Sequence, residues 1–166
     1  MFTFNLSLPV HSALLAAGLF MGSGAQAADA PVTRPRADIT LAGAERVLDA
    51  AFSEAERNQW VISAAVVDSS GELVAFRKAD GAIGISPSVA IGKARTAALL
   101  RQPSKSFEDF INGGRPSFLS TPEILPLEGG VPIAVDGLVV GAVGVSGAHG
   151  PNDSQVASKA SEAVAP

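Results

Sequence analysis

Residues 131–145 read VPIAVDGLVVGAVGV, and this stretch decides the fold more than any other in the chain. Two apolar runs flank Asp136-Gly137, a dipeptide that suits the type I′ turn of a tight hairpin. We therefore predict two antiparallel strands over 131–135 and 138–145. One face of the second strand shrinks along its length, ending in Ala142 and Gly144. Small side chains there would let a helix, a neighbouring subunit or a flat ligand approach the backbone closely.

The rest of the sequence predicts a second hairpin and four helices. Residues 60–67 and 72–77 are apolar runs around a loop that ends in Gly71, which predicts another hairpin. Apolar spacing predicts a helix over 41–58, and Ser86-Pro87 predicts a second helix over 87–101 with Ser86 as its N-cap. A short helix over 104–111 follows. A last helix opens at Asn152, with Gln155 completing a capping box. This order predicts an α+β fold with a mainly antiparallel sheet.

Length and composition limit the class of protein. The chain has 166 residues, a length typical of one domain, with 47% hydrophobic and 17% charged residues, so disorder is not expected. Its net charge of −4 argues against nucleic acid as the main partner. The absence of cysteine excludes disulfides, thiolate metal sites and a cysteine nucleophile.

The first 27 residues differ from the rest because they contain no Lys, Arg, Asp or Glu. Their apolar run, residues 12–21, is too short to span a bilayer and is followed by Ala25-Gln26-Ala27. We interpret residues 1–27 as a signal peptide, 28–38 as a linker and 39–166 as the folded domain. The mature protein would begin at Ala28 and be periplasmic or secreted, without membrane insertion. The alternatives are a buried N-terminal helix and a lipid-facing anchor.

Three segments in the predicted order resemble the GlcG/HbpS-like family: residues 64–76, 90–98 and 129–147. The family includes extracellular haem-binding proteins, the C-terminal domain of PduO-type adenosyltransferases and proteins linked to glycolate utilisation. The resemblance implies a profilin-like, five-stranded antiparallel sheet flanked by helices, and a homo-oligomer. It favours an exported binding protein for haem or a related tetrapyrrole. An enzyme or accessory protein acting on a small organic acid, and a purely structural oligomer, are the alternatives.

The predicted helix 87–101 offers the first candidate binding residues. Lys93 and Thr96 share a helical face with two aliphatic side chains. Lys93 is a candidate to neutralise a ligand carboxylate such as a haem propionate, and Thr96 to hydrogen-bond or weakly ligate. The structural alternative is that Lys93 extends along apolar surface to solvent and Thr96 bonds a carbonyl of the preceding turn.

His149 is the candidate metal ligand. Once residues 1–27 are removed, the chain contains no Met or Tyr and no other His, so His149 is its single standard haem ligand. The alternative is an ordinary loop residue. A triad of His149 with Asp153 and Ser146 or Ser154 is disfavoured because these residues are too close in sequence. We therefore name no catalytic residue. The carboxylates Glu45, Asp49 and Glu56 fit a solvated helix face, and residues 129–132 fit a loop entering a strand.

Overall fold

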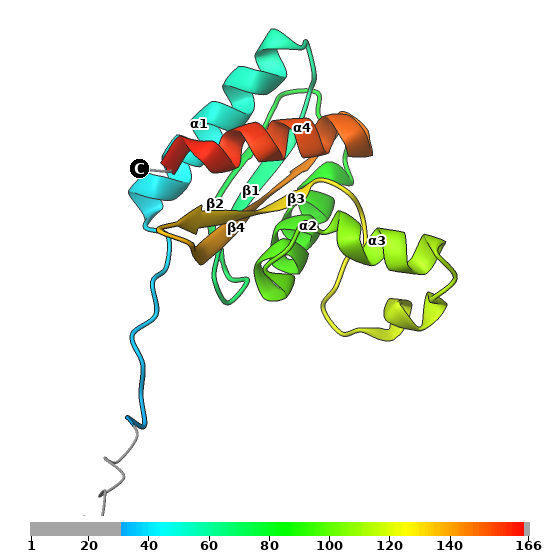
Figure 1. Cartoon of the computed structure of the whole chain (residues 1–166). Coiled ribbons are helices and arrows are strands. Elements are labelled where there is room, and N and C mark those ends of the chain that lie inside the picture. Colours follow the sequence, from blue (N-terminus) through cyan, green and yellow to red (C-terminus); the bar gives the residue numbers. More distant parts are fainter. Residues whose placement is uncertain (1–30, 165–166) are drawn as a thin grey trace, which may run out of the picture. The chain divides into compact units, whose positions relative to one another are not determined.

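The computed structural model describes residues 31–164 (Figure 1). The predicted leader, residues 1–27, and the start of the linker lie outside the described residues. Within residues 31–164, no helix is both long and apolar enough to cross a membrane.

The helices and strands follow one another largely as the sequence predicts. In chain order they are α1 (Leu41–Arg57), β1 (Ser63–Asp68), β2 (Leu73–Lys78), α2 (Ser86–Leu100), α3 (Lys105–Asn112), the 3-10 turn η1 (Pro116–Ser120), β3 (Gly130–Val135), β4 (Leu138–Ser146), α4 (Gly150–Ser161) and the 3-10 turn η2 (Glu162–Val164).

The two predicted hairpins form one antiparallel sheet in the order β2-β1-β4-β3. Each hairpin pairs its own strands, and β1 pairs with β4 to join them, with Val66 opposite Val143. Asp136 and Gly137 both have positive φ, +51° and +76°, as the type I′ turn requires. The antiparallel α+β fold predicted from sequence is confirmed.

The sheet of the described residues has four strands, where the resemblance implied five. At the outer edge of β3, Ser104 donates its N–H to Gly130 O and accepts from Gly130 N through Oγ, which closes that point to a further strand. At the other end of β4, Ile39 N donates to Val140 O. A single backbone bond to this segment does not make a strand.

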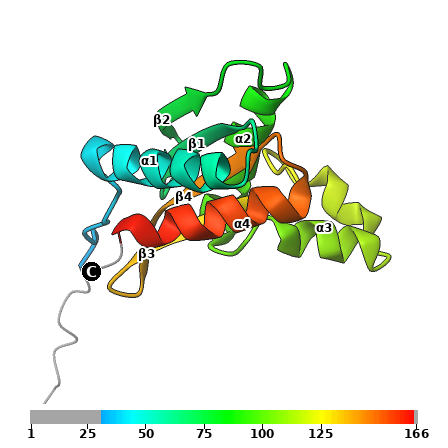
Figure 2. The same cartoon turned by 90° about the horizontal axis from the view of Figure 1, so that it is seen from above.

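Helices cover both faces of the sheet. α1 and α4 lie side by side on one face, and α2 lies on the other (Figures 1 and 2). Side chains alternate along β1, so Ala64 and Val66 face α1 while Ala65 and Val67 face α2. Gly144 packs against α2, because a Cβ there would overlap with the backbone of Ala90 and Ala94. The sequence allowed a helix, a neighbouring subunit or a flat ligand against this face of small side chains. In the structure, helix α2 packs there.

Two predicted helix starts are wrong. Ser86 is not a cap: it lies inside α2, where its Oγ donates to Ile83 O and hydrogen-bonds Ser63 Oγ. The last helix begins at Gly150 instead of opening at Asn152, and Gln155 is not part of a capping box. Both predictions considered only capping within the helix. In the structure, Ser86 hydrogen-bonds Ser63 on β1, and Gln155 hydrogen-bonds Glu54 on α1.

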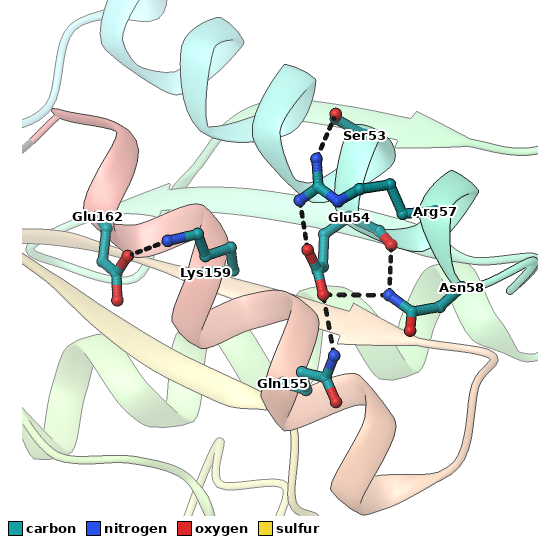
Figure 3. Close-up of polar contacts among 7 residues, drawn as sticks. All are labelled: Ser53, Glu54, Arg57, Asn58, Gln155, Lys159 and Glu162. Atoms are coloured by element: carbon teal, nitrogen blue, oxygen red, sulfur yellow. Dashed lines mark hydrogen bonds and ion pairs between the residues drawn. The ribbon is translucent and has the colours of Figure 1, made fainter.

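Gln155 instead joins α4 to α1 (Figure 3). Its Nε2 donates to Glu54 Oε1 at 2.8 Å, and Glu54 also accepts from Arg57 in the same helix and from Asn58, which caps that helix. Glu54 is 9% exposed. The hydrogen bond from Gln155, followed by that from Arg57, holds the pKa of the Glu54 carboxyl below its ordinary value. Its charged form therefore stabilises the contact between the two helices.

Candidate functional site

Lys93, the first candidate, forms a buried ion pair across the end of the sheet. It lies on α2 and is 3% exposed. Its Nζ donates to Asp153 Oδ2 at 2.8 Å and to Val145 O at 3.0 Å. Asp153 lies on α4, on the opposite face, so the pair links the two helical layers past the end of β4. The sequence singled out Lys93 but gave no sign that Asp153 was its partner.

Two glycines make room for this ion pair. A Cβ on Gly129 would lie 2.8 Å from Lys93 Nζ and equally close to Asp153 Cβ, and a Cβ on Gly130 would overlap with Lys93 O. Gly129 also has a φ of +122°, a value that favours glycine. The Gly129-Gly130 segment is the predicted loop entering a strand, and the structure adds the reason for its composition.

Asp153 also fixes the loop that leads into α4. Its Oδ1 accepts from Ala148 N at 2.9 Å, and its own N–H donates to His149 O at 2.7 Å. Both carboxylate oxygens are thus engaged, one by Lys93 and one by Ala148. Neither oxygen bonds to an imidazole, whereas in a catalytic triad the carboxylate orients the imidazole.

A cleft of about 380 Å³ opens beside this ion pair. Lys93, Asp153 and His149 line it together, with Glu108 and Glu128 among its polar residues. Its apolar lining residues are Ile83, Ile85, Val89 and Leu127. A second hollow of about 380 Å³ follows α2 and shares Ile85 and Val89 with the cleft. We call the two together the α2 groove; its far part is lined by Glu123, Ile124 and Leu125.

The walls of the α2 groove are unusually exposed for aliphatic side chains. Ile83 is 63% exposed and Ile85 61%, and both lie in the segment that leads into α2. Leu127 on the opposite wall is 42% exposed. Because the hydrophobic effect favours covering such surface, the groove fits a ligand with an apolar body.

The charges of the cleft are unevenly placed. Lys93 and Asp153 offset each other at its base, which leaves Glu108 and Glu128 as acidic side chains nearby. Glu108 accepts from the backbone N–H of Glu128 at 2.6 Å. An anionic group of a ligand would therefore favour the side of His149, or solvent, over the side of these glutamates.

Thr96 is fully buried and does not line the α2 groove. Its Oγ1 donates to Gly92 O at 2.8 Å and accepts from Leu125 N, also at 2.8 Å. Thr96 thus holds the segment that forms the far wall. Of the three binding residues predicted from sequence, the structure brings Lys93 and His149 together and leaves Thr96 behind the wall.

His149 is exposed at the start of α4 and contributes to the cleft. Among residues 31–164, no group of three or more His, Cys, Asp or Glu side chains is arranged to hold a metal ion. Of the scattered carboxylates, Asp49 pairs with Arg77 at 2.9 Å.

Another hollow, of about 320 Å³, lies where residues 37–43 meet Val135, Val140 and Val164. None of the residues predicted to bind a ligand lines it. Its lining combines apolar side chains with Asp38 and Arg46, and it lacks an imidazole or a buried ammonium group. The α2 groove is therefore the better candidate site.

Known proteins resemble this chain in sequence and in fold. The profile of the family described as "Haem degrading protein HbpS-like" matches residues 39–162. Protein GlcG of Escherichia coli K12 is 44% identical over 103 residues, covering 62% of this chain and 77% of GlcG. The crystal structure of a Streptomyces reticuli HbpS double mutant is 28% identical, with a TM-score of 0.74, covering 94% of this chain and 99% of that one.

The crystal structure of the PduOC:haem complex shares the fold alone, at 23% identity and a TM-score of 0.68, covering 76% of this chain and 95% of that one. The HbpS-like profile, in contrast, extends over α1 to α4 and every strand between them. With this match, and with a fold shared with HbpS itself, the chain belongs to the HbpS-like family.

Proposed function

We propose that this protein binds haem or a closely related tetrapyrrole in the α2 groove. The observation that carries the proposal is the combination of exposed aliphatic walls with an exposed imidazole at one end. A tetrapyrrole is flat and largely apolar, and it carries carboxylates at one edge. The groove offers the matching chemistry, and its volume lies in the range of small-molecule sites.

The residues present fit such a ligand. Ile83, Ile85 and Leu127 would cover the apolar body. Lys93 is already paired with Asp153, so the carboxylates of the ligand would lie toward solvent. His149 is the one side chain of the predicted mature protein that is a strong axial ligand for haem iron. Bound haem iron would supply redox chemistry, whereas the role of these residues is binding and orientation. The family description and the haem complex of PduOC support the choice of ligand.

The proposal is tested by titrating the protein with hemin and following the Soret band. Saturable binding is expected for the wild type, and Ile85→Glu should weaken it at least tenfold because a charge enters the apolar wall. Leu138→Glu is the matched control, since Leu138 is also 61% exposed but lies outside the groove. Failure of the wild type to bind hemin would refute the function, and unchanged binding by Ile85→Glu would refute the site.

A small organic acid is the second candidate ligand. A cleft of about 380 Å³ lined by the exposed His149 beside the Lys93–Asp153 pair is large enough for it. The resemblance to a family that includes proteins linked to glycolate utilisation implies the same alternative. Glycolate should then raise the melting temperature of the wild type in a saturable way, while hemin should not bind. This outcome would separate the two functions.

We further propose that the protein acts outside the cytoplasm as a homo-oligomer. The uncharged leader, residues 1–27, with its small residues at the end, supports export and cleavage before Ala28. Mass spectrometry of the native protein should find Ala28 at the N-terminus, and an intact leader would contradict export. Light scattering at micromolar concentration should give a mass above that of the monomer.

A further inference from the structure

The backbone of His149 adopts a conformation that side chains rarely tolerate. Its φ of +73° and ψ of +152° fall in a region that is essentially restricted to glycine. Arg101 also has positive φ, but its angles of +54° and +31° lie in the left-handed helical region, which other residues enter at smaller cost. The conformation of His149 is therefore strained because it carries a Cβ.

The surroundings of His149 force this conformation. Gly147, with φ of +132°, is packed so closely on Val61 that a Cβ there would overlap with the Val61 carbonyl oxygen. On the other side, Asp153 holds Ala148 N and His149 O through two hydrogen bonds. Lys93 in turn holds Asp153. The path of the loop is thus set by bonds that do not involve the His149 side chain.

Glycine at position 149 would follow the same path without strain, so the imidazole is not needed for folding. Among the hydrogen bonds and ion pairs of residues 31–164, none involves the imidazole ring of His149. The side chain is exposed and lines the cleft beside Lys93. Strained residues of this kind concentrate at functional sites, where the surrounding structure holds them in place.

We propose that His149 directly contacts the ligand of the α2 groove and that its backbone strain is retained for this contact at the expense of stability. The inference rests on the proposed function for the identity of the ligand, a tetrapyrrole. It adds a specific role for one residue, and it makes a claim about stability that holds without any ligand.

The test compares His149→Gly with His149→Ala. Both variants remove the imidazole, but Ala keeps the Cβ that causes the strain, so it is the matched control. In ordinary contexts a glycine variant is less stable than the matching alanine variant, because glycine gains more conformational freedom on unfolding. Here the order should reverse: His149→Gly should melt several degrees above both His149→Ala and the wild type. Both variants should bind hemin at least tenfold more weakly and lose any low-spin spectrum.

The outcomes separate the inference from the proposed function. Equal or lower melting temperature for His149→Gly than for His149→Ala would overturn the claim of strain. Wild-type hemin affinity and spectrum in both variants would overturn the contact, while leaving hemin binding by the protein intact. If the wild type itself does not bind hemin, the proposed function and the ligand contact fall together, and the melting temperatures still decide the claim of strain.

Discussion

The ion pair between Lys93 and Asp153 should be strongly coupled, and a double-mutant cycle measures this. Both side chains are 4% exposed, so water screens neither charge when its partner is removed. Lys93→Met leaves a buried carboxylate, and Asp153→Asn leaves a buried ammonium. Each single substitution is expected to reduce the free energy of unfolding by about 3–5 kcal/mol. For a domain of this size that corresponds to a fall in melting temperature of roughly 10–20 °C.

The double variant should be more stable than either single variant. It contains no buried charge at this position. The asparagine side chain that replaces Asp153 keeps an oxygen for Ala148 N. Replacing a whole buried ion pair by neutral groups is often close to neutral in stability.

Urea unfolding of the wild type, the two single variants and the double variant gives the four stabilities of the cycle. Unfolding is followed by far-UV circular dichroism and by the fluorescence of Trp60, the single tryptophan. Repeating the measurement at two protein concentrations separates unfolding from dissociation of an oligomer. Lys159→Met, which removes an exposed cation from α4, should leave stability unchanged. Additive losses in the double variant, or single losses below about 1 kcal/mol, would refute the coupling of the buried pair.

The remaining predictions concern packing and pH. Gly144→Ala should lose at least about 1–3 kcal/mol of stability in urea, because its Cβ would overlap with the carbonyl oxygen of Ala90. Gly84→Ala should not lose stability, because the space around Gly84 is open. Equal losses of stability in the two variants would contradict the close packing of α2 on Gly144. The lowered pKa of Glu54 means that its stabilising charge is present above the ordinary pKa of 4.5 and is lost as pH falls through the folded-state pKa. Glu54→Gln should therefore flatten this acid dependence of the melting temperature, as should Gln155→Ala, and a profile like that of the wild type would contradict the role of the contact.

Local sequence determined the elements of the fold. The spacing of apolar residues placed a helix over 41–58, and the structure has it over Leu41–Arg57. Asp136-Gly137 predicted its turn because the two residues tolerate the positive φ values that a tight hairpin needs. These features depend on residues near one another in sequence, so the pattern alone carries them.

Tertiary structure decided which side chains meet. Lys93 and Asp153 are on different helices, and their contact exists because two glycines let one helical layer reach the other past the end of the sheet. The predicted cap at Ser86 failed for a related reason, since a partner on β1 engages its hydroxyl. Distant partners cannot be read from local spacing.

The candidate site divides in the same way. Helical spacing placed Lys93 and Thr96 on one face of a predicted helix, and His149 is the single standard haem ligand that follows the predicted leader. The tertiary structure decided that Thr96 faces the wall segment and that Lys93 and His149 share a cleft. It also set the strained backbone of His149. Composition determines which groups are available, but long-range packing and hydrogen bonding determine where each one points.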